Sequence, residues 1–242
     1  MHRKLYLLAA LCAVLVLSPA CDSATVNRLA QAAQSTLLSE DDIGLGLKQA
    51  LEDGITRGAA QLSQRGGYFD SPYKILLPEE ARRVTDRLQR VPGFNNIEDI
   101  VLEKINAGAE DAASKARPIF VDAIRQMSFA DATSILMGAD DAATSYLRDR
   151  TFEALYAEFS PVIAESLDKF QARKVWSDAQ TAYNKIPLIE DVDVELADYV
   201  TREALSGLFQ RVAVEELNIR DNVSARSNDL VRRVFARQDE RS

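Results

Sequence analysis

The sequence is almost without histidine and cysteine: the one histidine is His2, and the cysteines are Cys12 and Cys21. From residue 22 onward the chain therefore has no imidazole and no thiol. This excludes a histidine general base, a cysteine nucleophile and His- or Cys-ligated zinc or haem in that part of the chain. A G-x-x-x-x-G-K-[ST] phosphate loop is also missing. We therefore expect no cofactor and no metal site.

Long hydrophobic runs are missing beyond the N-terminal end. The one such run, Leu5 to Leu17, follows the basic residues Arg3 and Lys4 and precedes Ser18-Pro19-Ala20. This order is typical of a secretory signal. As a helix the run would span roughly 20 Å, which is too short for a membrane anchor that must cross about 30 Å. We predict that residues 1–20 are a signal peptide and that the protein is exported to the periplasm.

Cys21 stands where a lipoprotein signal places its lipidated cysteine. No second cysteine would remain after cleavage to pair with it, which favours lipidation and a lipid anchor to the membrane. Two features fit less well, because Leu17 lies four residues before Cys21 rather than three and Pro19 lies between them. The alternative is ordinary cleavage after Ala20, which leaves an unmodified thiol.

The composition predicts a folded acidic domain. Hydrophobic residues make up 47% of the chain and charged residues 27%, which argues against disorder. Removal of residues 1–20 takes away Arg3 and Lys4 and no acid, so the net charge changes from −8 to about −10. A surface this acidic argues against nucleic acid as a partner and against broad attachment to anionic lipid.

Apolar residues recur with helical period in segment after segment, and no dependable strand is found. The fold class we predict is all-α: a compact multi-helix bundle of about nine or ten helices preceded by the signal peptide. The expected helices cover residues 24–38, 41–64, 78–91, 96–117, 119–127, 128–137, 142–170, 195–217 and 222–235, and one more helix carries Trp176 and Tyr183 and ends before Pro187. We expect residues 21–38 to be an N-terminal tether and short helix, 39–237 a single domain, and 238–242 a frayed tail.

Three local patterns refine this outline. Gly46, Gly54 and Gly58 recur every four or eight residues along one helix, which predicts a close crossing with another helix. Ser128 with Asp131 three residues later predicts a helix N-cap. Pro161 is expected to kink or split the helix that contains it.

Residues 186–194 alternate apolar and acidic side chains. A short strand is one reading, but no partner strand is visible, so we prefer a linker that caps the helix starting near Glu195. The spacing of Asp191, Asp193 and Glu195 would also suit a hard cation such as calcium, although capping explains these acids more simply. The adjacent pair Glu215-Glu216 is expected to face solvent.

Aromatic residues offer one candidate binding groove. Its members would be Tyr68, Phe69, Tyr73, Trp176 and Tyr183. The alternative is that these side chains cover the core of the bundle.

Three separated blocks resemble a known family. They are Gly66-Gly67-Tyr68-Phe69 with Lys74-Ile75-Leu76-Leu77-Pro78, Asp131 to Gly138 running into Ala142 to Tyr146, and Tyr199-Val200-Thr201 with Ala204 to Phe209, Glu215-Glu216 and Ile219-Arg220. Over about residues 35–237 the chain resembles a family of exported bacterial proteins described only as a domain of unknown function. One departure is Ala107, where the family pattern leads us to expect arginine. The resemblance implies export and one domain, and it brings no activity, cofactor or catalytic residue.

Two classes of function follow. The first is a non-catalytic cell-envelope protein, a binding or assembly module for an unidentified protein or small molecule. The alternative is a periplasmic enzyme that uses carboxylate, tyrosine or serine chemistry in an aromatic-lined cleft. Two or more buried acids without arginine partners in one cleft would favour the enzyme.

Overall fold

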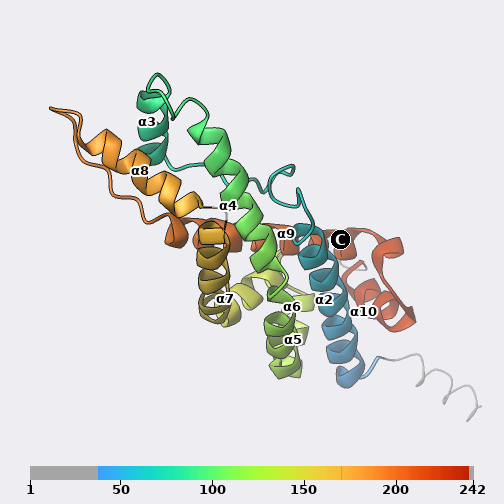
Figure 1. Ribbon diagram of the computed structural model, residues 1–242. Helices are drawn as coiled ribbons and strands as arrows, with labels where there is room; N and C mark the ends of the chain where they lie inside the picture. The colour runs from blue at the N-terminus through green and yellow to red at the C-terminus, as the bar shows by residue number, and fades with distance from the viewer. Residues whose placement is uncertain (1–37, 170, 240–242) are drawn as a thin grey trace, which may run out of the picture. The chain divides into compact units, whose positions relative to one another are not determined.

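In the computed structural model, residues 38–169 and 171–239 are described, and within them the regular structure is helical throughout (Figure 1). The predicted all-α class is confirmed. The predicted signal peptide, Cys21 and nearly all of the short helix at 24–38 lie outside the described residues. The helices are α2 (Glu40–Leu62), α3 (Glu79–Leu88), α4 (Ile97–Ala113), α5 (Ala116–Gln126), α6 (Phe129–Leu136), α7 (Ala142–Lys169), α8 (Ala172–Asn184), α9 (Leu196–Asp221), the 3-10 helix η1 (Val223–Ala225) and α10 (Asp229–Asp239).

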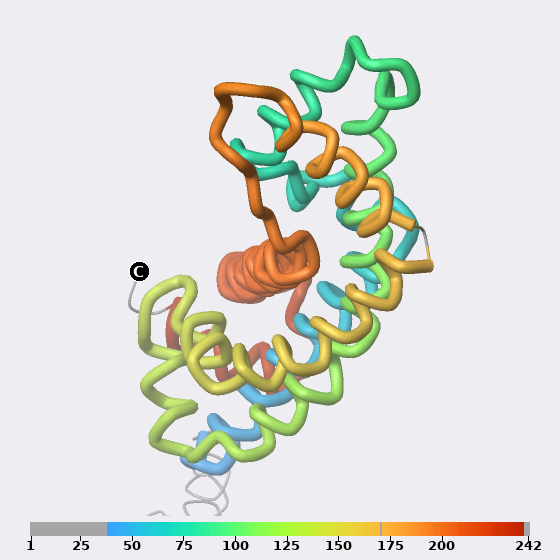
Figure 2. The backbone as a smooth tube through the Cα atoms, turned by 60° about the vertical axis from the view of Figure 1, so that its left-hand side comes forward, coloured from blue at the N-terminus to red at the C-terminus, as the bar shows by residue number. Residues whose placement is uncertain are grey.

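Helix α9 is the central element of the unit that begins at Glu40. It packs against α7 and α2, and Figure 2 shows it nearly end-on with the other helices beside it. Its middle section buries side chains over much of its circumference, including Leu205, Leu208 and Phe209. The Phe209 ring meets the edge of Phe120 from α5 with ring centroids 5.7 Å apart. A helix that is apolar on several faces belongs in the interior, and this explains its position.

Two glycines of the α2 stripe, Gly54 and Gly58, form the predicted close crossing with α9, whereas Gly46 faces Val234 of α10. A Cβ atom at Gly54 would lie 3.4 Å from Glu215 Cβ and from Ile219 Cδ1, both on α9. A Cβ at Gly58 would lie 3.4 Å from Arg211 Cγ. The glycines therefore let α2 and α9 approach to a distance at which larger side chains would collide.

Prolines mark helix boundaries less sharply than the sequence predicts. Helix α5 begins at Ala116 rather than after Pro118, because proline fits the first turn, where its missing N–H removes no helical hydrogen bond. Pro161 lies inside α7, which continues unbroken from Ala142 to Lys169. A split at Pro161 is therefore wrong, and a kink there stays a prediction.

The C-terminal helix is also shifted from its predicted bounds. It starts at Asp229 after the 3-10 turn, where the Asn228 carboxamide oxygen accepts from the Val231 N–H, and it ends at Asp239 rather than at 235. Arg226 donates to both carboxylate oxygens of Asp239, at 2.7 and 2.9 Å. This bidentate contact holds the last turn, so Gln238 and Asp239 belong to the helix and not to a frayed tail.

No helix of the described ranges is long and apolar enough to cross a membrane.

Candidate binding surfaces

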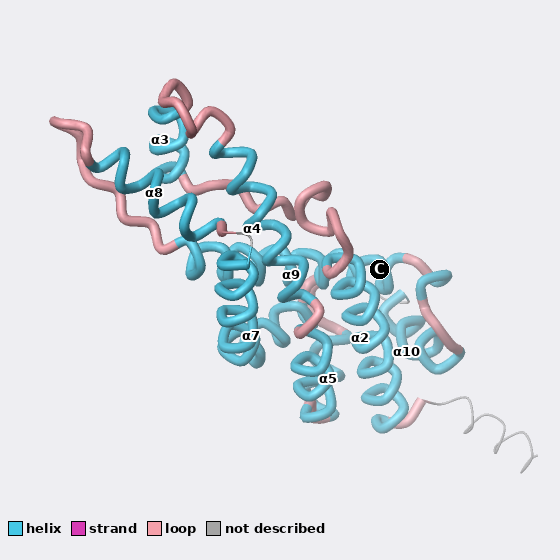
Figure 3. Tube along the Cα trace, in the orientation of Figure 1, coloured by secondary structure: helices cyan, strands magenta, loops and turns pink. Residues whose placement is uncertain are grey.

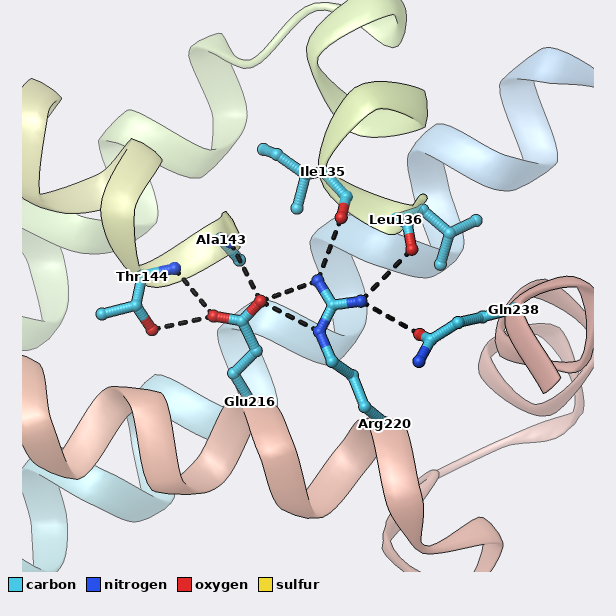
Figure 4. A network of polar contacts seen from close by, with 7 residues as sticks. All are labelled: Ile135, Leu136, Ala143, Thr144, Glu216, Arg220 and Gln238. Atoms are coloured by element: carbon cyan, nitrogen blue, oxygen red, sulfur yellow. Dashed lines mark hydrogen bonds and ion pairs between the residues drawn. The ribbon is translucent and has the colours of Figure 1, made fainter. Parts of the chain in front are cut away.

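Glu216 and Arg220 form a buried ion pair on α9 that joins two other helices (Figure 4). The Glu216 carboxylate accepts from the backbone N–H of Ala143 at 2.9 Å and of Thr144 at 2.8 Å, at the start of α7. The Arg220 guanidinium donates to the carbonyls of Ile135 and Leu136, at the end of α6, at 3.0 and 3.2 Å. Each charge thus matches the sign of a helix dipole end.

The neighbouring Glu215 is buried as well, and two arginines neutralise it. Arg57 from α2 donates to its carboxylate at 2.8 Å, and Arg211 from the preceding turn of α9 pairs with its other oxygen. The prediction that Glu215 and Glu216 face solvent is wrong. Adjacent positions on a helix point about 100° apart, so the two acids reach different partners, and both partners are distant in sequence.

The aromatic residues of the candidate groove occupy two regions. Tyr68 is fully buried and its hydroxyl donates to the Ala204 carbonyl of α9 at 2.7 Å; burial raises its pKa above the ordinary tyrosine value. Tyr73 packs over the same helix, since a Cβ at Gly207 would lie 3.3 Å from Tyr73 Cβ and 3.0 Å from the Tyr68 ring. Trp176 and Tyr183 are buried on α8. Tyr68 and Trp176 thus serve the core, as the alternative reading held.

Phe69 lines an acidic hollow between the 65–73 loop and α4. The hollow measures about 400 Å³, and its other lining residues include Arg65, Asp70, Asp99, Glu103 and Glu110. Glu110 is buried, and its carboxylate accepts from the backbone N–H groups of Tyr68 at 3.1 Å and Phe69 at 3.2 Å. Among the described residues no three His, Cys, Asp or Glu side chains are grouped to hold a metal ion.

A second hollow lies between α5 and α7 and includes Asp131, Tyr146 and Arg150. Hydrogen bonds from Ser128 lower the pKa of Asp131, and the two residues form the predicted capping box of α6. Burial, and next the charge of Asp131, raise the pKa of Tyr146. Since Asp131 already caps a helix, we assign it a structural role.

The hollow lined by Trp176 contains an arrangement that the sequence analysis missed. Figure 3 shows the loop that follows α8 running back beside that helix toward α9. Three side chains of α8, four residues apart, hydrogen-bond to residues 190–195 of this loop. Trp176 Nε1 donates to the Val194 carbonyl at 3.1 Å, and Gln180 Nε2 donates to the Val192 carbonyl at 2.7 Å. Asn184 accepts from the Val192 N–H at 3.0 Å and donates to the Val192 carbonyl at 3.1 Å.

The spacing of the two elements explains this fit. Four residues of a helix rise about 6 Å, and two residues of an extended strand advance about 6.6 Å. This spacing lets Trp176 and Gln180 reach the carbonyls of Val194 and Val192, two residues apart, and Asn184 binds Val192 as well. Burial along the segment alternates too: Val192 and Leu196 are buried, whereas Asp191, Asp193 and Glu195 are exposed.

Residues 190–195 are thus strand-like in their alternating burial and hydrogen bonds, although no strand is assigned there, and side chains of α8 take the place of a partner strand. Neither expectation for this segment was complete, since it is extended and also caps α9: the Glu195 carboxylate accepts from the Ala197 N–H at 3.2 Å. The hollow beside it measures about 380 Å³. The sequence signals that point to it are the acidic-apolar alternation and the polar amides at Gln180 and Asn184.

The described residues thus form an all-α domain that carries open, acidic surface hollows. Its chain belongs to the family described as "Protein of unknown function (DUF4197)", whose model matches residues 37–236. This confirms the suspected family of unknown function. No curated protein and no solved structure matches the chain.

Proposed function

We propose that the protein is a non-catalytic binding or assembly module of the bacterial cell envelope, and that a protein partner docks at the extended segment 190–195. The observation that carries this proposal is the seam between α8 and that segment. Asn184, Gln180 and Trp176 fix one edge of the segment, while its acidic side chains remain exposed. A strand held rigid with one edge uncovered suits a peptide-binding surface.

The tip of the same loop supports the proposal. Leu188 is fully exposed, and its φ of 67° lies in the left-handed region. This backbone conformation costs a non-glycine residue about 1–3 kcal/mol, and an exposed leucine recovers none of it by packing. A contact with a partner would bury the Leu188 side chain, which is not buried in the isolated domain.

The placement of buried acids favours binding over catalysis. The buried carboxylates among the described residues are Glu110, Glu215 and Glu216. The last two are paired with arginines, so only Glu110 is buried at the wall of a hollow without an arginine partner. This falls short of the two unpaired acids in one cleft that would favour an enzyme.

Export and lipid anchoring of Cys21 belong to the same proposal. They rest on the basic start, the apolar run Leu5 to Leu17 and the position of Cys21. Stable anchoring takes about two acyl chains, which the modified cysteine of a bacterial lipoprotein would supply. The acidic domain itself would then need no contact with the bilayer.

Site-specific photo-crosslinking in the native envelope tests the proposal. A photoreactive amino acid at Asp193 should crosslink to one protein, which mass spectrometry of the adduct identifies. The same group at Arg233, on the exposed side of α10, is the matched control and should give no such adduct. Equal labelling from both positions, or none from Asp193, would contradict docking at this segment.

A further inference from the structure

The extended segment has one edge whose backbone is unused. In an extended chain the N–H and C=O of one residue point to one side and those of the next residue to the other. Since Asn184 takes both backbone groups of Val192, the groups of Asp191 and Asp193 point away from α8. Within the part of the chain that the structure describes, the backbone groups of Asp191 and Asp193 have no hydrogen-bond partner.

A second extended segment shows the contrast. Ile75 is held by Asn106 in the same way, with hydrogen bonds of 2.8 and 2.9 Å to its N–H and C=O. There the other edge is used as well, because the Leu76 carbonyl accepts from the Tyr199 hydroxyl at 2.7 Å. The same side-chain clamp thus occurs twice, and only at residues 191–193 does it leave both backbone groups of the alternate residues unpaired.

The charges beside the unused edge have one sign. Asp191, Asp193 and Glu195 are exposed at alternate positions, so their carboxylates share one face of the segment about 6.6 Å apart. Arg173 lines this hollow and is paired with Asp168; it also interacts electrostatically with Glu195, whereas no ion pair is formed by Asp191 or Asp193 among the described residues. A strand with cations at alternate positions would place one opposite each carboxylate.

We propose that the partner contributes an extended segment with lysine or arginine at alternate positions, which adds to residues 190–195 as a β-strand. This inference rests on the function proposed above and names the chemistry of its partner. Backbone hydrogen bonds to Asp191 and Asp193 supply the pairing, and the carboxylates select basic side chains. A second copy of this chain is disfavoured, because two acidic edges would repel each other.

The direct test uses a labelled ten-residue peptide that alternates lysine with threonine, titrated against the purified domain by fluorescence anisotropy. A second peptide carries N-methyl groups on the residues whose N–H groups would pair, and a third carries them on the other residues. The first and third peptides should bind alike, and the second should bind at least about tenfold more weakly. Equal binding of all three would show a purely electrostatic contact and overturn strand addition.

Variants of one residue separate backbone from charge. Asp193→Pro removes the unused N–H, together with the carboxylate that accepts from Gln180 Nε2 at 3.3 Å, and should weaken binding about tenfold or more. Asp193→Asn keeps the N–H and should weaken binding only about two- to fivefold. Asp149→Asn, which removes an exposed acid of α7, is the charge-matched control and should leave binding unchanged. Circular dichroism and a melting curve check that each variant is folded.

The outcomes distinguish this inference from the proposed function. Crosslinking at Asp193 without binding of the basic peptide would keep the docking surface and reject its basic-strand chemistry. If no peptide binds and Asp193 gives no crosslink, the acids only protect an exposed edge from aggregation, and both proposals are wrong.

Discussion

The Asn184 carboxamide and the Val192 peptide group exchange two hydrogen bonds, at 3.0 and 3.1 Å, as paired residues of neighbouring β-strands do. A helix thereby fixes an extended segment without a sheet. Asn184 lies in the last turn of α8 and Val192 in the connection to α9, so the contact closes a local loop. Its stability and the use of its open edge are separately testable.

Asn184→Ala should destabilise the domain by about 1–3 kcal/mol, because it leaves the Val192 N–H unpaired and removes one of two donors to its carbonyl. Urea unfolding measures the loss, and hydrogen exchange at the Val192 amide should accelerate. Asn218→Ala on the exposed face of α9 is the control, with an expected change within about 0.5 kcal/mol. Equal effects of the two variants would contradict the role of the clamp.

Gly54→Leu should lower the free energy of unfolding by about 1–3 kcal/mol, because the new side chain would meet Glu215 and Ile219 at the crossing of α2 and α9. Ala60→Leu, at an exposed position of the same helix, should change it by less than about 0.5 kcal/mol. The urea midpoint measures both variants. An unchanged midpoint for Gly54→Leu would mean that the crossing is looser than described.

Arg220→Met should cost about 3–5 kcal/mol, since it leaves Glu216 buried without its cation and the end of α6 without its donors. Combining it with Glu216→Gln should cost less than the sum of the two single losses. The exposed pair Arg232–Asp229 gives the control, because Arg232→Met should cost no more than about 1 kcal/mol. Additive losses in the double variant would argue against coupling.

Asp239→Asn should lower the free energy of unfolding at neutral pH and make it less dependent on pH in the acidic range. The hydrogen bonds and charge of Arg226 hold the pKa of Asp239 below its ordinary value. A lowered pKa contributes stability above the unfolded value of about 3.9, and this contribution is lost as the pH falls through the folded value. The variant should therefore be less stable than wild type at pH 7, and the gap should close below about pH 4. A gap that persists at low pH in urea titrations would exclude this cause.

Cys21→Ser should release the protein from the membrane into the soluble periplasmic fraction without unfolding it, if the proposed lipid anchor is attached there. Membrane fractionation and mass spectrometry of the native N-terminus measure the two parts of this expectation. Wild-type protein that is already soluble and carries an unmodified N-terminus after Ala20 or later would replace the anchor with plain secretion.

Local signals predicted much of the fold. The helical period located nearly all the described helices, and the glycines of α2 indicated the crossing with α9, because both signals depend only on neighbouring residues. Ser128 and Asp131 gave the cap of α6 for the same reason. The end of α10 was missed because the apolar pattern stops at Phe235. The helix continues to Asp239, whose carboxylate is bound by Arg226.

The hydrogen-bond partners of the buried polar groups could not be predicted from neighbouring residues in the sequence. Glu216 was assigned to solvent because nothing near it in sequence reveals the two helix ends that it and Arg220 contact. At residues 190–195 the alternation was visible, but a partner strand was sought, and amide side chains of α8 hold the segment instead. The surface proposed for binding therefore became apparent only from the arrangement in space.

The helix ends joined by Glu216 and Arg220 also set an order of events during folding. Arg220 reaches back 84 residues to the Leu136 carbonyl, so the turn between α6 and α7 gains this contact only after most of α9 has been synthesised. A chain that is still being synthesised, or that is cut before residue 216, lacks both charges. We expect such fragments to hold their early helices loosely, and folding to be slower than in bundles whose contacts are local. The packing of the earlier helices is thus completed only when α9, in the last quarter of the chain, is present.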